Sequence, residues 1–89
     1  LAAFDDINNG QSIMSVTSRL GTEPIYDLKL TPDNEEFIKA SGLRSLPSVP
    51  DSVNSRVIVY PWRGPPVRFI FIFYNQHDSN VVAKAYGKP

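Results

Sequence analysis

The sequence predicts an α+β fold in which short N-terminal helices pack on a three-stranded antiparallel meander sheet. Helical apolar spacing and helix-capping residues fall in the first half of the 89-residue chain, about residues 2–41. Three β-rich runs fill the second half, about residues 55–86. A segment rich in proline and serine, residues 43–54, joins the two halves, and we expect it to form a surface loop anchored by apolar side chains. One domain over residues 1–89 is therefore expected.

The first half contains two helix signals before residue 24. Residues 2–7 could form a short helical turn, which Asn8, Asn9 and Gly10 end. Ser12 is a suitable N-cap for a second helix, whose apolar stripe is Ile13, Val16 and Leu20. Gly21 and Pro24 then predict its end, so this helix covers about residues 13–20.

A further helix is predicted over residues 32–41. Pro32 suits the first turn, Asp33 with Glu36 resembles a capping box, and Gly42 ends the helix. Residues 25–30 alternate between apolar and polar and predict either an edge strand or an extended connector.

The three predicted strands cover residues 55–61, 66–75 and 80–86, with short hairpin connections between them. The middle strand is apolar on both faces, because Phe69, Phe71 and Phe73 alternate with Ile70, Ile72 and Tyr74. The helix at 13–20 is expected to cover the phenylalanine face. The second face needs other cover, from the 43–54 loop, a second subunit or a partner protein.

Composition excludes several classes of function. Nine basic residues balance nine acidic ones and are scattered along the chain, which argues against nucleic-acid binding. There is no cysteine, hence no disulfide, thiol nucleophile or zinc–thiolate site. No apolar run approaches the roughly 20 residues of a membrane-spanning helix. The chain opens on Leu1 without an initiator Met, so we expect a trimmed or mature fragment, with any signal peptide or lipid-bearing Cys upstream.

Catalytic chemistry is not predicted. His77 stands beside Asp78 in a polar turn, but no nucleophile or second metal ligand accompanies it. The acid pairs Asp5–Asp6 and Glu35–Glu36 are adjacent in sequence and therefore diverge rather than converge on a substrate. We expect no enzyme, no catalytic residues, no metal and no cofactor.

Protein binding is the function that the residue types favour. Tyr60, Trp62 and Arg63 belong to the types enriched in binding hot spots, and three prolines stiffen the connection that carries them. The alternatives for Trp62 are that it folds back onto the end of the sheet as core, or that it lines a ligand pocket. A second predicted binding patch consists of Ile70, Ile72 and Tyr74 on the outer face of the central strand. The expected partner is another protein or a second copy of the chain.

The segment from Ile7 to Pro24 resembles the SmpA/OmlA (BamE-like) family of small outer-membrane lipoproteins. The matching residues are Ile7, Gly10, Ser12, Val16, Leu20, Gly21 and Pro24, and the stretch from Phe73 to Ala85 looks like the family's closing hairpin. The resemblance implies a helix–helix–three-strand fold, shared with β-lactamase-inhibitor-protein-like domains. This chain departs from the family by the longer segment 25–54, with its extra helix.

The resemblance also implies a role. Members of the family are non-enzymatic accessory factors of outer-membrane assembly, so we expect a domain of the periplasm or outer membrane that binds an envelope protein, with any lipid anchor upstream of Leu1. The alternatives are a homo-oligomeric structural or regulatory domain and a secreted inhibitor-like module. The fold alone does not decide among them.

Overall fold

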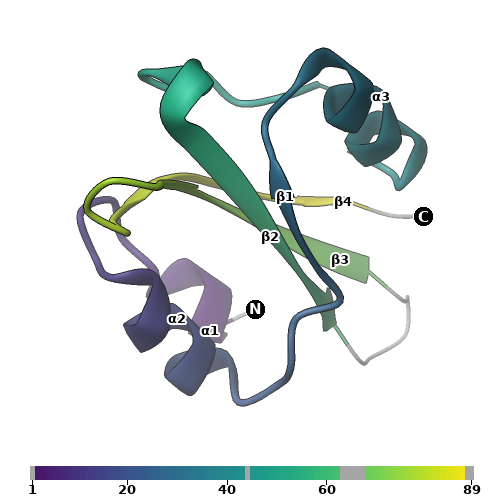
Figure 1. Ribbon diagram of the computed structural model, residues 1–89. Helices are drawn as coiled ribbons and strands as arrows, with labels where there is room; N and C mark the ends of the chain where they lie inside the picture. Colours follow the sequence, from purple (N-terminus) through teal and green to yellow (C-terminus); the bar gives the residue numbers. More distant parts are fainter. Residues whose placement is uncertain (1, 44, 63–67, 88–89) are drawn as a thin grey trace.

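The computed structural model describes residues 2–43, 45–62 and 68–87, and the side chains of Ala2, Ala3, Trp62 and Arg68 fall outside this description. It has an α+β fold, as predicted, with helices on both faces of one antiparallel sheet (Figure 1). The elements in chain order are α1 (Ala2–Asp5), α2 (Ile13–Leu20), β1 (Tyr26–Lys29), α3 (Pro32–Ala40), a short 3₁₀ turn (Ser52–Asn54), β2 (Ser55–Trp62), β3 (Arg68–Asn75) and β4 (Val81–Gly87).

The sheet has four strands in the order β1-β2-β3-β4, so the prediction of three strands was wrong. The added strand, β1, lies within the 25–30 segment, for which the sequence predicted either an edge strand or a connector. β1 pairs antiparallel with β2, with Leu28 opposite Val57. Strands β2, β3 and β4 form the predicted meander, and β3 lies between its two neighbours, with Ile58 opposite Ile72 and Ile72 opposite Lys84.

Helices α1 and α2 cover the face of the sheet that carries Ile70, Ile72 and Tyr74. The sequence assigned α2 to the phenylalanine face and left this one to the 43–54 loop, a second subunit or a partner, and both assignments were wrong. Val16 of α2 is fully buried. The core cluster on this face is Phe4, Ile7, Val16, Ile58, Tyr60, Ile70, Ile72, Tyr74 and Val81.

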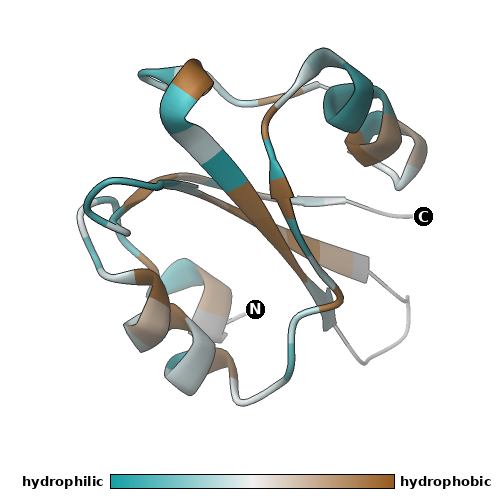
Figure 2. Ribbon diagram, in the orientation of Figure 1, coloured by the Kyte–Doolittle hydropathy of each residue, from teal (hydrophilic) through white to brown (hydrophobic). Residues whose placement is uncertain are grey.

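The phenylalanine face is closed by α3 and the segment that follows it. Ile38 of α3 is fully buried there, and Leu43, Leu46 and Val49 pack beside it. Three of the apolar side chains expected to anchor the 43–54 loop therefore do pack on the core, whereas the fourth, Val53, is 75% exposed. Figure 2 shows the apolar colouring concentrated on the sheet and on the sides of the helices that face it. Both faces are thus covered within one chain.

Helix boundaries follow their capping residues. The Ser12 hydroxyl accepts a bond from the Ser15 amide, and Gly21 ends α2 in the left-handed conformation at φ 65°, as predicted. Helix α3 begins with Pro32, but its N-cap is Thr31, whose hydroxyl accepts from the Asn34 amide at 3.2 Å. The Asp33–Glu36 capping box was therefore the wrong assignment.

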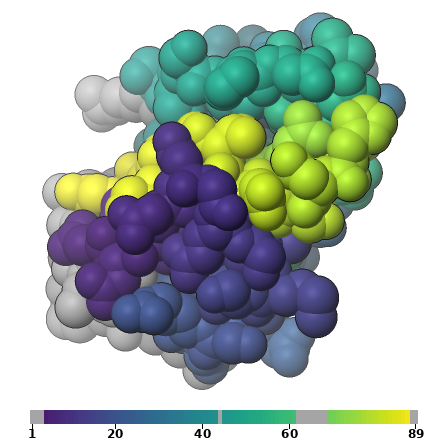
Figure 3. All heavy atoms as spheres, turned by 90° about the vertical axis from the view of Figure 1, so that its left-hand side faces the viewer, coloured from purple at the N-terminus to yellow at the C-terminus, as the bar shows by residue number. Residues whose placement is uncertain are grey.

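The segment between α1 and α2 pairs with the start of β4. The Gly10 amide donates to the Val81 carbonyl at 2.7 Å, and the Val81 amide donates to the Gln11 carbonyl at 2.8 Å. Figure 3 shows the N-terminal segment lying against β4 and the turn before it. This contact occupies the beginning of the β4 edge. None of the helices in the described part of the chain has the length and apolar composition needed to cross a bilayer.

Candidate protein-binding surface

The predicted patch on the central strand is not at the surface. Ile70 is 1% exposed, Ile72 is fully buried and Tyr74 is 7% exposed, because α1 and α2 lie over them. Their apolar character reflects the core of a sheet that is covered on both sides. Ile72 and Tyr74 cannot contact a partner in this fold, and Ile70 reaches only the wall of the groove described below.

Tyr60 is also a core residue and not the predicted surface anchor. It is fully buried, and its hydroxyl lies 2.6 Å from the Thr17 hydroxyl of α2. This burial raises the pKa of Tyr60 above its usual value. The bond fastens α2 to β2. The side chain of Trp62 and the whole of Arg63 lie outside the described residues, so their predicted role stays a prediction.

A polar network fastens β1 to the rest of the sheet. The Tyr74 hydroxyl donates to the carboxylate of Asp27, 2.8 and 2.9 Å from its two oxygens. Arg56 Nε donates to the same carboxylate at 3.0 Å. Burial, followed by the hydrogen bond to Asp27, raises the pKa of Tyr74 to about 12. Three strands are joined by these three side chains, which fixes the position of β1.

The free edge of β1 is protected against the addition of another strand. The Leu30 amide donates to the Ser55 carbonyl, so the alternating main-chain groups of Asp27 and Lys29 point away from β2. The Asp27 carbonyl already accepts Arg56 Nη2 at 3.1 Å, and the Lys29 carbonyl accepts Asn34 Nδ2 at 2.7 Å. Natural edge strands are commonly blocked by such side chains. A partner at β1 would therefore bind through side chains.

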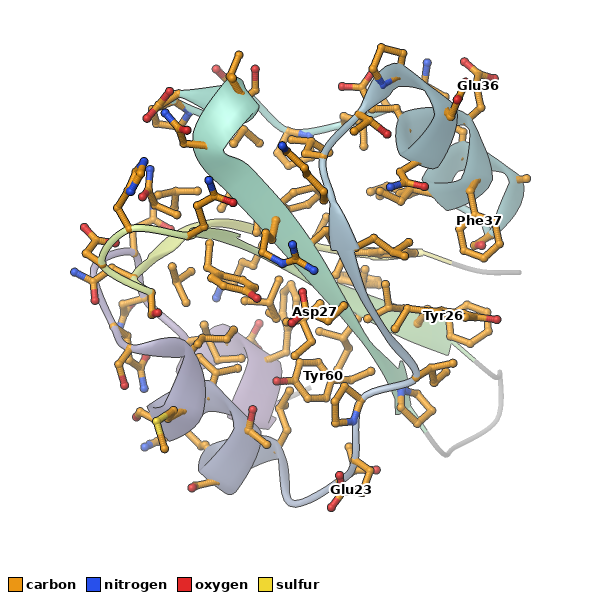
Figure 4. All side chains as sticks on the ribbon, in the orientation of Figure 1. Glu23, Tyr26, Asp27, Glu36, Phe37 and Tyr60 are labelled. Carbon is orange, nitrogen blue, oxygen red and sulfur yellow. The ribbon has the colours of Figure 1, made fainter. Side chains whose placement is uncertain are left out.

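Exposed aromatic side chains meet where β1 begins. Tyr26 and Phe37 form an edge-to-face pair with ring centroids 5.2 Å apart, although each is more than 40% exposed. Ile25, the residue immediately before Tyr26, is 42% exposed. Figure 4 shows Tyr26 and Phe37 to the right of β1, one above the other, with Glu23 at the bottom of the view and Glu36 at the top on α3. We call Glu23, Ile25, Tyr26, Glu36 and Phe37 the β1 surface.

A groove of about 670 Å³ opens on the other side of Ile25. Its apolar lining comes from the end of α2, the start of β1 and the neighbouring strands, and Glu23 contributes a carboxylate. The lining residues are Leu20, Gly21, Thr22, Glu23, Ile25, Pro61 and Ile70. Ile25 thus belongs both to the groove and to the β1 surface, and it connects them.

The residues considered for catalysis do not converge in the described structure. His77 lies exposed in the β3–β4 turn, where its amide donates to Asn75 Oδ1 at 2.8 Å. Asp6 forms an exposed ion pair with Arg19, and Glu36 forms one with Lys39. Within residues 2–43, 45–62 and 68–87, no group of three or more His, Cys, Asp or Glu side chains is arranged to hold a metal ion.

Sequence reasoning missed Tyr26 and Phe37. A signal for Phe37 was present, because Phe37 and Ile38 are adjacent on a short helix and only one of them can face the core. Tyr26 had a weaker signal, since it follows Ile25 in a segment whose strand character was open. Their contact depends on how α3 packs beside β1, which spacing alone does not give.

No protein-family model, curated protein or solved structure matches this chain. The resemblance to the SmpA/OmlA family therefore rests on the residues from Ile7 to Pro24 and from Phe73 to Ala85.

Proposed function

We propose that this chain is a non-enzymatic protein-binding domain whose partner docks on the β1 surface and the adjoining groove. The observation that carries the proposal is a set of three large apolar side chains, each more than 40% exposed: Ile25 and Tyr26 where β1 begins, and Phe37 of α3, whose ring packs on Tyr26. Scattered exposed apolar residues need no explanation, whereas an exposed aromatic pair next to a groove that is lined by a third exposed apolar residue is typical of a contact site.

The rigidity of the surrounding structure supports this assignment. The Asp27, Arg56 and Tyr74 network holds β1 in place, and the edge-to-face pair joins β1 to α3. Side chains that are ordered before binding lose less entropy when a partner docks.

The cell envelope is the proposed location, and assistance in outer-membrane assembly or maintenance is the proposed role. Both come from the family resemblance, and the arrangement of α1 and α2 over the β2–β4 meander is compatible with it. On this reading, residues 25–54 supply β1 and α3 as an addition to the meander, and the β1 surface belongs largely to that addition. A partner specific to this chain would use it.

Capture of a partner by the immobilised domain tests the proposal. Ile25→Glu places a charge between the groove and the aromatic pair, and it should abolish the retention of a protein from envelope extract. Met14→Glu is the matched control, because Met14 is 79% exposed on α2 and does not line the groove. Equal retention by both variants and the unmodified domain would refute docking at the β1 surface.

A further inference from the structure

We infer that the occupant of the β1 surface is a basic segment of a partner protein, one that presents Arg or Lys among aliphatic side chains. The inference rests on the proposed function, because it names the chemistry of the partner at the same surface. Three features of the described residues carry it: the local charge, the exposed aromatic pair and the composition of the groove.

The charge of this part of the chain is acidic although the whole chain is neutral. Residues 21–43 hold five acidic residues against two basic ones, a formal charge of −3, while the complete sequence has nine of each. The acidic residues are Glu23, Asp27, Asp33, Glu35 and Glu36. Such an imbalance attracts a basic partner and selects against an acidic one.

The two cations of this segment leave the acidic character in place. Lys39 lies 3.7 Å from Glu36, but the Glu36 side chain is 78% exposed and the pair is therefore weak and readily exchanged. Lys29 lies at the far end of β1 from Tyr26, opposite Arg56 on β2. Asp27 is already paired with Arg56, which leaves Glu23 and Glu36 as the carboxylates of the β1 surface available to a partner.

The aromatic pair suits the same partner. Tyr26 and Phe37 stand at 87° to each other, and both rings are partly exposed. A guanidinium or ammonium group is attracted to the face of an aromatic ring, and a guanidinium also stacks on such rings. The fold already contains one such contact, with Lys84 Nζ 4.7 Å from the ring centroid of Phe4.

The groove matches the aliphatic part of such a segment. Leu20, Ile25 and Pro61 give it apolar walls, and Glu23 stands among the lining residues. A long basic side chain has an apolar stem and a charged head, so it can fill the groove with its stem and place its head at Glu23. An acidic side chain would meet repulsion at the same carboxylate.

Titration with defined peptides tests the inference. The probes are a twelve-residue peptide of alternating Arg and Val, and matched peptides with Glu or Gln in place of every Arg. NMR amide shifts report the site and fluorescence anisotropy reports the affinity. We expect only the Arg peptide to bind, with shifts at Glu23, Tyr26 and Phe37.

Charge reversal provides the matched variants. Glu23→Lys combined with Glu36→Lys should weaken binding of the Arg peptide by about tenfold or more. Asp5→Lys combined with Asp6→Lys changes the net charge by the same amount, on exposed residues at the end of α1. This control should change the affinity for the Arg peptide by less than twofold. Equal weakening by the two double variants would refute a local site.

The outcomes separate this inference from the proposed function. If the Gln or Glu peptide binds as tightly as the Arg peptide, the partner is not a basic segment, although docking at the β1 surface is unaffected. The same conclusion follows if none of the three peptides binds while Ile25→Glu still abolishes partner capture. Self-association that Glu23→Lys disrupts would identify the occupant as a second copy and also overturn the inference. No peptide binding together with unchanged capture by Ile25→Glu would overturn both.

Discussion

Replacing Val16 with Ala tests whether α2 closes the second face of the sheet. Val16 is fully buried against the cluster that contains Ile70, Ile72 and Tyr74. Removing two methyl groups loses roughly 1.6 kcal/mol of transfer free energy. The space left, on the order of 50 Å³, adds about 1 kcal/mol at the usual cost per volume. We therefore expect the free energy of unfolding to fall by about 2–3 kcal/mol.

That loss is large for a chain of this size. A domain of 89 residues has a total stability of roughly 5–13 kcal/mol. Each kcal/mol corresponds to a change in Tm of about 4–8 °C in a domain of this length, so Tm should fall by at least about 8 °C. Urea unfolding followed by circular dichroism, with thermal unfolding beside it, measures both quantities.

Met14→Ala is the control on the same helix. Met14 is 79% exposed, and its truncation should change the free energy of unfolding by less than about 0.5 kcal/mol. If Val16→Ala lowers the free energy of unfolding by no more than Met14→Ala does, then α2 does not pack on this face, and the burial of Ile70 and Ile72 needs another explanation.

Three further predictions concern substitutions of single residues. The pKa of Tyr74 is near 10 in the unfolded chain and about 12 in the folded chain, so the free energy of unfolding should fall as the pH rises from 10 to 12. Tyr74→Phe should make this fall smaller, as measured by urea unfolding at a series of pH values. An unchanged slope would contradict the raised pKa. Gly87→Ala should lower the free energy of unfolding by about 1–3 kcal/mol, because a Cβ would lie 2.7 Å from the Gly42 carbonyl oxygen. An unchanged free energy of unfolding would show that the backbone shifts to relieve this contact. Trp62→Ala should keep the Tm and weaken partner capture, whereas a collapse of Tm would place Trp62 in the core.

The helices and the meander could be predicted from the sequence because their signals are local. Ser12 and Gly21 bound α2 at both ends, and Pro32 marks the start of α3. Alternation in the central strand correctly indicated that both of its faces are covered. The α+β class follows from these elements alone.

The assignment of helices to faces could not be predicted in the same way. Alternation shows that two faces exist, but which helix covers which face depends on the path of residues 21–25 around the sheet. That path puts α2 on the face of Ile72, and β1 then leads to α3 on the face of Phe71. The prediction of an open second face failed for this reason, and the binding patch based on it failed with it.

The β1 surface was beyond local reasoning because it is formed by a tertiary contact. Tyr26 and Phe37 are eleven positions apart and meet only through the packing of α3 beside β1. Hot-spot composition pointed instead to Tyr60, which the structure buries against Thr17. Composition identifies residue types suited to binding, but exposure decides which of them can bind.

Site-specific photo-crosslinking tests the central claim most directly. A photoreactive p-benzoylphenylalanine would replace Tyr26 in one variant and Met14 in another, and each would be irradiated in the cells that express the protein. The proposed docking at the β1 surface predicts a covalent adduct with one partner protein from position 26 and none from position 14. No adduct at position 26, or the same adduct from both positions, would contradict it.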